Sequence, residues 1–176
     1  MKIEICGYSG AGKSMLAKEL GNLYNIPVLH LDSINFEPNW VERDRTLLEE
    51  DIRKFMRENE SWVIDGSYFD RVKERYSEAD YIIVMNFSRL KSLRRILKRN
   101  KTYKGIKRDD LAEGCDERFS LSFILWAMFG SRKKERRNKL KSICETYSDK
   151  VIYLKSQKDI DKFLGRIKNG GSIKEN

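Results

Sequence analysis

The sequence predicts an α/β fold in which a five-stranded parallel sheet is covered by helices on both faces. Short apolar runs alternate with longer amphipathic segments along nearly the whole chain. The predicted strands are residues 1–6, 26–31, 62–64, 81–85 and 151–154. Because most of these runs are apolar, they are typical of strands buried on both faces. The alternation of strands with helices indicates the crossover connections of a parallel sheet.

The predicted helices have apolar residues at spacings of three and four. They are residues 13–24, 44–60, 119–129 and 159–168, and a further helix that follows Ser88. Ser88 is a suitable N-cap for that helix. Its expected inward-facing stripe is Leu90, Leu93, Ile96 and Leu97. The polar segments 32–40 and 100–114 are expected to be loops.

Length and composition fit a single domain that spans residues 1–176. Apolar residues make up 40% of the chain, which argues against a disordered protein. The longest apolar run, residues 119–129, is shorter than the ~20 residues that span a bilayer, and no signal-peptide pattern precedes the first strand. The three cysteines are far apart and argue against a disulfide framework. We therefore expect a cytoplasmic protein without a membrane span.

A glycine-rich motif follows the first predicted strand and opens the first helix. It matches the pattern GxxxxGK[ST] with Gly7, Tyr8, Ser9, Gly10, Ala11, Gly12, Lys13 and Ser14. Glycines let the backbone curl so that its amides point at phosphate oxygens, and the helix presents its N-terminus to the same anion. Lys13 can reach the β- and γ-phosphates, and the Ser14 hydroxyl can bind Mg²⁺. The motif therefore predicts that ATP and Mg²⁺ bind here.

Two aspartates follow apolar strands and are candidates for the metal site. Asp32 follows the second strand and Asp65 follows the third. Ligands of an open parallel sheet bind at the carboxyl ends of its strands, so both aspartates are expected beside the phosphate loop. Asp32 is also a candidate to accept the proton of a substrate hydroxyl. As alternatives, Asp65 forms a turn with Gly66 and Asp32 bonds to its own backbone. His30 is interpreted as a partly buried, hydrogen-bonded histidine.

The net charge of +9 is concentrated in residues 89–141, where 18 Lys and Arg outnumber 6 Asp and Glu. This block indicates a polyanionic partner, either nucleotide phosphates or a nucleic acid. Arg95 and Arg99 share one helix face, and Arg132 and Arg136 form a second cluster after a polar segment. The arrangement predicts a lid whose arginines close over bound phosphates and exclude water. The alternative is a solvated helix face with surplus basic residues.

Four motifs, taken in order, resemble those of the nucleotide-kinase-like P-loop proteins related to adenylate kinase. The likeness is closest to the bacterial DNA topology modulation proteins and spans nearly the whole chain. The motifs are the phosphate loop, His30-Leu31-Asp32 with Pro38 and Trp40, Trp62-Val63-Ile64-Asp65-Gly66-Ser67-Tyr68, and Arg95-xxx-Arg99.

This resemblance implies a three-layer P-loop NTPase fold of the nucleoside-monophosphate-kinase type, with strand order 2-3-1-4-5. It implies an acceptor-binding region at about residues 32–60 and a helical lid at about residues 99–139. It also implies that Arg95 and Arg99 contact phosphates and that Asp65 lies near Mg²⁺. Arg132 and Arg136 are lid candidates by their position alone.

The acceptor side differs from adenylate kinase. Adenylate kinases have Asp-Gly-Phe-Pro-Arg where this chain has Asp65-Gly66-Ser67-Tyr68-Phe69, so the arginine that grips the acceptor monophosphate is missing. The placement of Asp32 is more similar to shikimate- or gluconate-type kinases, whose acceptor is a small hydroxylated molecule. Trp40 in this region is expected either to stack on a ring of the acceptor or to pack in the core.

The leading hypothesis is a kinase that moves the γ-phosphoryl group of ATP to a nucleotide or a small hydroxylated acceptor. Its candidate catalytic residues are Lys13, Asp32, Arg95, Arg99, Arg132 and Arg136. Its candidate metal ligands are Ser14, Asp65 and Asp32. Two alternatives stay open: a nucleotide-dependent, nucleic-acid-binding regulator, and an NTPase switch with no acceptor. The first has thin support, because the sequence has no clear nucleic-acid-binding signature beyond its basic block.

Overall fold

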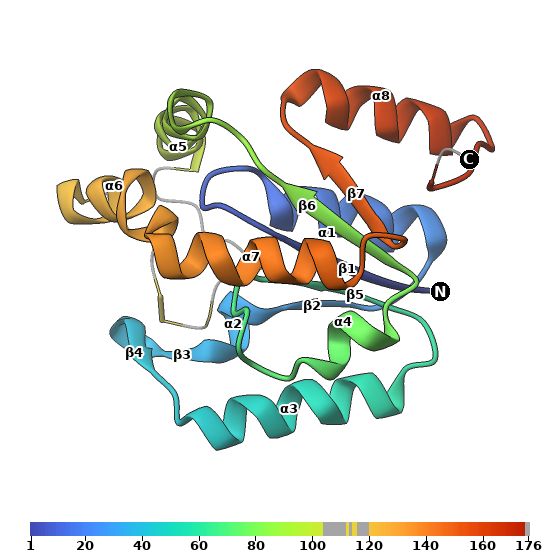
Figure 1. Cartoon of the computed structure of the whole chain (residues 1–176). Coiled ribbons are helices and arrows are strands. Elements are labelled where there is room, and N and C mark those ends of the chain that lie inside the picture. Colours follow the sequence, from blue (N-terminus) through green and yellow to red (C-terminus); the bar gives the residue numbers. More distant parts are fainter. Residues whose placement is uncertain (104–111, 113, 116–119, 175–176) are drawn as a thin grey trace.

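The computed structural model describes residues 1–103, 112, 114–115 and 120–174 (Figure 1). The strands of its central sheet are β1 (Lys2–Gly7), β2 (Val28–His30), β5 (Trp62–Asp65), β6 (Tyr81–Met85) and β7 (Val151–Leu154). Their order across the sheet is β2-β5-β1-β6-β7, and each neighbouring pair is parallel. The predicted strands and their order 2-3-1-4-5 are therefore confirmed.

Helices cover both faces of the sheet and give the predicted three layers (Figure 1). One layer holds α1 (Lys13–Tyr24) and α8 (Gln157–Lys168), and the other holds α3 (Arg45–Glu58), α4 (Glu74–Glu78) and α7 (Lys134–Thr146). Successive side chains of β1 point to opposite faces. Ile3 and Ile5 join the core under α1 and α8, whereas Glu4 and Cys6 face the other layer. Each fully buried isoleucine contributes roughly 1.5–3 kcal/mol.

Side-chain caps define where two of the helices begin. Asp44 accepts hydrogen bonds from the amides of Thr46 and Leu47, at 2.8 and 3.3 Å, at the start of α3. Ser156 accepts a hydrogen bond from the amide of Asp159, at 3.2 Å, at the start of α8. Each cap satisfies amides that the first helical turn leaves unpaired and is typically worth ~1 kcal/mol.

The segment predicted as a loop at 32–40 is instead ordered secondary structure. It contains α2 (Leu31–Asn35), β3 (Phe36–Glu37), the 3₁₀ turn η1 (Pro38–Trp40) and β4 (Val41–Glu42), with β3 and β4 forming an antiparallel hairpin. The Ser33 hydroxyl donates to the His30 carbonyl at 2.7 Å and closes the turn that opens α2. Arg43 closes the hairpin, because its amide donates to the Asn35 carbonyl at 2.9 Å and its guanidinium to the Ile34 carbonyl at 2.8 Å.

Helix α5 (Arg89–Tyr103) is longer than predicted, and its buried stripe differs from the prediction. Ile96 is buried as expected, but Leu90 and Leu97 are 66% and 45% exposed, so their predicted inward position is wrong. The helix packs on the phosphate loop through a narrow strip that contains Ser92 and Ile96. A Cβ at Gly10 would lie 2.8 Å from the Ile96 side chain, which shows how closely loop and helix approach.

The predicted lid, residues 99–139, is described in part. The described part includes the end of α5, residues 112 and 114–115, α6 (Leu121–Met128), η2 (Gly130–Arg132) and the start of α7. Residues 104–111, 113 and 116–119 of this prediction lie outside the described residues. Figure 1 shows α5, α6 and the β3–β4 hairpin on the same side of the molecule. Within the described ranges, no helix combines the length and apolar character needed to cross a membrane.

Candidate functional site

The phosphate loop lies between β1 and α1, where the backbone needs glycine. Gly7, Gly10 and Gly12 have φ angles of 134°, 75° and 95°, in the region that favours glycine. A Cβ at Gly7 would also collide with the Met85 carbonyl on β6. The twelve-residue helix α1 begins directly after the loop, so its free amides face the same space. The geometry is that of an anion-binding turn at the carboxyl edge of the sheet.

The eight predicted loop residues divide into two groups. Gly7, Ser9, Gly10, Gly12, Lys13 and Ser14 line a cavity. Tyr8 and Ala11 are instead buried in the two cores, with exposed fractions of 8% and 0%. Their side chains therefore anchor the loop, and any contact they make with a phosphate is through the backbone. The Lys13 ammonium lies over the loop and donates to the Tyr8 carbonyl at 3.4 Å.

Asp65 is fixed by hydrogen bonds to both of its carboxylate oxygens. The Ser14 hydroxyl donates to one oxygen at 3.0 Å, and His30 Nδ1 bonds to the other. Asp65 is 4% exposed, and His30 is also buried. The carboxyl ends of β2 and β5 and the first turn of α1 thus meet at one carboxylate. The structure brings Ser14 and Asp65 together as the metal-site prediction requires, and it places His30 behind them as a hydrogen-bonded, buried residue.

The donor set at this point suits Mg²⁺. A serine hydroxyl and a carboxylate are hard oxygen ligands, and Mg²⁺ usually binds one or two such groups together with substrate phosphates and water. Within the part of the chain that the structure describes, no group of three or more His, Cys, Asp and Glu side chains is placed to hold a metal. A metal bound here would therefore take its other ligands from water and from a bound phosphate.

Asp32 lies on α2 and is exposed to the cavity, in contrast to the buried Asp65. Its carboxylate accepts a hydrogen bond from the Tyr68 hydroxyl at 2.6 Å. Burial and the neighbouring Asp32 carboxylate raise the pKa of Tyr68 well above its usual range, so the phenol stays a donor. Tyr68 therefore holds Asp32 in a fixed orientation. Tyr68 belongs to the sequence motif that follows β5, but this role was not predicted from the motif.

The turn after β5 is supported from two directions. Ser67 exchanges hydrogen bonds with the backbone of Gly7, whose amide donates to the Ser67 hydroxyl at 3.1 Å. The buried Arg75 of α4 donates to the Tyr68 carbonyl at 2.8 Å and to the Gly66 carbonyl at 3.5 Å. The same guanidinium pairs with Glu4 of β1, and both side chains are fully buried.

Sequence reasoning missed Arg75. A signal was present, because Glu4 stands among apolar residues in a buried strand, and a buried carboxylate requires a partner. That partner, however, is 71 positions away in the sequence.

The four predicted arginines have different positions. Arg95 and Arg99 line the cavity from α5, and Arg95 lies directly against Gly12 of the phosphate loop and bonds to Gln157. Burial lowers the pKa of Arg95. Arg136 lines the cavity from α7 and donates to the Ser67 carbonyl at 3.0 Å.

Arg132 lies beneath the loop rather than on the cavity wall. It donates to the Phe87 carbonyl at 2.8 Å and to the Ser92 hydroxyl at 3.1 Å. Its guanidinium also lies 3.9 Å from the centre of the Tyr8 ring. These contacts tie the β6–α5 connection to the phosphate loop.

One cavity connects these groups. It has a volume of about 1240 Å³ and extends from Lys13 and Ser14 past Asp32 and Tyr68 to aromatic side chains of the hairpin and α6. Its size is sufficient for a nucleotide together with a second small molecule, because pockets for a single drug-sized ligand measure about 300–1,000 Å³.

The chain was compared with protein families, curated proteins and solved structures. A family model described as "AAA domain" matches residues 3–116. An uncharacterized protein from Eubacterium ventriosum ATCC 27560, known from a crystal structure, has a TM-score of 0.53 and 21% identity, with 97% of each chain covered. A shikimate kinase from Bacteroides thetaiotaomicron has a TM-score of 0.49 and 14% identity, with coverage of 96% of this chain and 97% of that one. No curated protein matches the chain.

The likeness to the Eubacterium ventriosum protein concerns the fold alone. The family model covers more than half of the chain and includes the phosphate loop, Asp32, Asp65, Arg95 and Arg99. The fold is that of a P-loop protein of the kinase or NTPase type. On this evidence, the chain belongs to the AAA domain family.

Proposed function

We propose that this protein is an ATP-dependent phosphotransferase that moves the γ-phosphoryl group to a small hydroxylated acceptor. The observation that carries this proposal is the continuity of one cavity, whose wall includes both the phosphate loop and the Asp32–Tyr68 pair. A switch that only hydrolyses ATP needs no ordered acceptor space beside its phosphate loop. The sparse, unpaired cysteines favour a cytoplasmic setting, where ATP is abundant.

The phosphate end of the cavity supplies charge stabilisation. The loop amides and Lys13 would hold the triphosphate, and Arg95 and Arg99, which line the cavity from α5, would neutralise charge on its oxygens. Ser14 and Asp65 would hold Mg²⁺, which neutralises negative charge on the phosphates when it is bound. Phosphoryl transfer depends mostly on positioning and on such electrostatic stabilisation.

Asp32 would accept the proton of the acceptor hydroxyl. The acceptor hydroxyl oxygen bonds to the γ-phosphorus while the bond to the bridging oxygen of ADP breaks, and Asp32 takes the hydroxyl proton. Tyr68 donates to the other side of the carboxylate and keeps it oriented for this step. The products are the phosphorylated acceptor and ADP.

A second candidate function follows from the outer face of α5. Arg89, Lys91, Arg94, Lys98 and Lys101 are exposed there, and the resemblance to DNA topology modulation proteins makes duplex DNA a candidate partner. Lys98 also lines the cavity. A gel-shift titration with duplex DNA distinguishes the two functions. Tight binding with a steep salt dependence supports the regulator, whereas loss of binding at moderate salt leaves only non-specific attraction.

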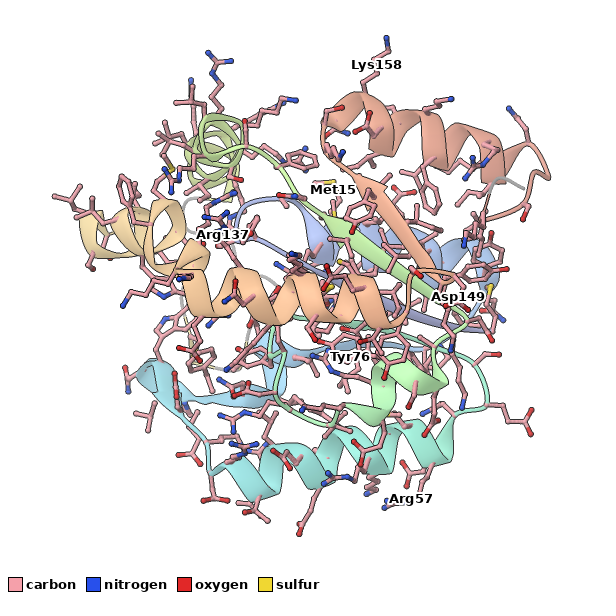
Figure 2. All side chains as sticks on the ribbon, in the orientation of Figure 1. Met15, Arg57, Tyr76, Arg137, Asp149 and Lys158 are labelled. Carbon is pink, nitrogen blue, oxygen red and sulfur yellow. The ribbon has the colours of Figure 1, made fainter. Side chains whose placement is uncertain are left out.

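The test of the kinase proposal is a γ-phosphate transfer assay with ATP, Mg²⁺ and a panel of hydroxylated acceptors. Lys13→Ala is expected to lower the transfer rate by about 10²–10³-fold, because it removes a positive donor from the charge that develops on the γ-phosphoryl group. The matched control is Lys158→Ala on α8, an exposed lysine that points away from the molecule (Figure 2). If the wild-type protein binds ATP tightly and transfers phosphate to no acceptor, the kinase proposal is wrong and the NTPase switch is the better explanation.

A further inference from the structure

The end of the cavity away from the phosphate loop is walled by aromatic side chains. This aromatic wall consists of Phe36, Trp40, Phe123 and Trp126. Phe36 and Trp40 of the hairpin meet edge to face, with ring centres 5.2 Å apart. Phe123 and Trp126 of α6 are stacked at 6.0 Å, and Trp126 is 46% exposed. Two elements far apart in sequence therefore present flat apolar surfaces to the same cavity.

The backbone at Trp40 indicates that its position is not simply a product of core packing. Trp40 has a φ of 64°, and the preceding Asn39 has a φ of 63°. The left-handed region is unfavourable for a bulky residue, and such conformations cluster at ligand-binding sites. The hairpin is held in this form by the hydrogen bond from the Asn39 amide to the Gly114 carbonyl, at 3.1 Å. The half-buried Trp40 side chain therefore lies on the cavity wall even though its backbone conformation is unfavourable.

The charge at this end is negative. Asp32 and Glu42 both line the cavity here. Among the described lining residues at this end, Arg136 carries the positive charge: its guanidinium donates to the Ser67 carbonyl and lies 6.0 Å from the centre of the Trp126 ring. The other cations among the described wall residues come from α1 and α5. They are Lys13, Lys18, Arg95, Lys98 and Arg99.

Among the described charges at this end, the two carboxylates outnumber the single Arg136 guanidinium, which disfavours a phosphate on the acceptor. A flat ring suits the aromatic wall, because stacking on aromatic side chains recognises the faces of bases. A hydroxyl suits Asp32, which the kinase proposal uses as the proton acceptor. An exocyclic amine on this ring suits Glu42, because an ionised carboxylate accepts hydrogen bonds and cannot donate them.

We propose, on the basis of the phosphotransferase function proposed above, that the acceptor is a nucleoside with an exocyclic amine. The base stacks on the aromatic wall, its amine donates to Glu42, and the sugar hydroxyl faces Asp32. The hydroxyl oxygen takes the γ-phosphoryl group and Asp32 takes the proton, so the products are a nucleoside monophosphate and ADP. Nucleosides are expected to be preferred over nucleoside monophosphates and aliphatic polyols as acceptors.

The experiment uses the full chain with γ-labelled ATP and Mg²⁺ and measures kcat and KM for matched acceptors. Adenosine is compared with inosine, and cytidine with uridine, because each pair differs in its amine. AMP, CMP, glycerol and gluconate test the other classes. We expect kcat/KM for the amine-bearing member of at least one pair to be about 10- to 100-fold higher than for its partner, because binding of the partner would leave Glu42 without a donor.

Variants connect this preference to named residues. Trp40→Ala is expected to raise the nucleoside KM by about 10- to 100-fold through lost stacking. Glu42→Gln, an exposed substitution that does not threaten the fold, is expected to remove the preference for the amine-bearing nucleoside. The matched control is Val41→Ala, because Val41 is 56% exposed on the same hairpin. It is expected to leave the nucleoside KM unchanged.

The outcomes separate the two proposals. Transfer to nucleosides that depends on Trp40 and Glu42 supports the inference. Transfer to AMP, CMP or the polyols without transfer to nucleosides overturns the inference and leaves the kinase function standing. An unchanged amine preference in Glu42→Gln also overturns it, whether or not Trp40→Ala folds. Transfer to no acceptor overturns the kinase function and the inference with it.

Discussion

Replacing Asp32 with asparagine is expected to lower the rate of phosphoryl transfer by about 10²–10⁴-fold, the range that general base catalysis supplies. Asparagine has nearly the same shape as aspartate, and its amide oxygen can still accept the hydrogen bond from Tyr68. It cannot take up the proton of the acceptor hydroxyl. The measurement is single-turnover transfer from labelled ATP, with ATP affinity determined in parallel to show that the phosphate site is intact.

The same variant separates the two roles predicted for Asp32. If Asp32 holds the metal, Asp32→Asn will increase the Mg²⁺ concentration that gives half-maximal rate, as Asp65→Asn is expected to do. If Asp32 is the base, the Mg²⁺ dependence stays that of wild type and only the rate falls. Asp149→Asn is the matched control, because Asp149 is exposed in the turn after α7, at the other end of that helix from Arg137 (Figure 2). A wild-type rate in Asp32→Asn would contradict the role of base.

The fold was predictable because its determinants are local. Apolar strands of four to six residues and amphipathic helices are visible in short windows of sequence. The chirality of parallel crossovers then leaves few topologies. The strand order itself came from the family resemblance, and the pairing of β1 with both β5 and β6 confirmed it. The phosphate loop was equally accessible, since its residues are contiguous and their spacing follows from the chemistry of anion binding.

The parts that sequence reasoning did not predict depend on contacts between distant segments. Residues 32–40 look like a loop, but hydrogen bonds from Arg43 to Ile34 and Asn35 fold them into a hairpin. The leucine spacing in α5 suggested a wide buried stripe. The helix instead touches the phosphate loop along a narrow strip at Ile96, so Leu90 and Leu97 are exposed.

For the site, the sequence predicted which residues lie at the ends of the strands, but it did not predict the hydrogen bonds that connect them. Ser14 and Asp65 were expected near each other, because both lie at the carboxyl edge of the sheet. The hydrogen bond from Tyr68 to Asp32 depends on how the turn after β5 folds, and that turn is held by α4. No short window of the sequence contains both partners. The positions of the lid arginines could not be predicted either, because Arg132 ends η2 and Arg136 lies in α7, and the two side chains contact different parts of the protein.

Arg75→Leu is expected to lower the free energy of unfolding by about 3–5 kcal/mol, because it leaves the fully buried Glu4 without its cation. Urea or thermal unfolding of the full chain measures this loss. Arg57→Leu is the matched control, because Arg57 is an exposed arginine near the end of α3 (Figure 2). A loss below about 1 kcal/mol in Arg75→Leu, the scale of an exposed ion pair, would contradict the assigned role.

The loss should also depend on pH. Burial raises the pKa of Glu4 from 4.5 to about 8, and the Arg75 guanidinium acts in the opposite direction. A carboxyl with a raised pKa in the folded state binds its proton more tightly there than in the unfolded chain. Its contribution to stability is therefore full below 4.5 and is lost as the pH rises through 8. Without Arg75 the pKa of Glu4 rises further, so the destabilisation is expected to be larger at about pH 9 than at about pH 6.

A double variant separates the stability of this pair from its role in the site. Glu4→Leu combined with Arg75→Met replaces both charges with apolar groups, and such replacements of buried pairs are often neutral or stabilising. Most of the stability lost in Arg75→Leu should therefore return. Phosphoryl transfer should be slower than in the wild type, because the double variant lacks the donor to the Tyr68 and Gly66 carbonyls. The turn that orients Asp32 therefore loses its support. If transfer returns together with stability, Arg75 stabilises the fold without positioning the Asp32–Tyr68 pair.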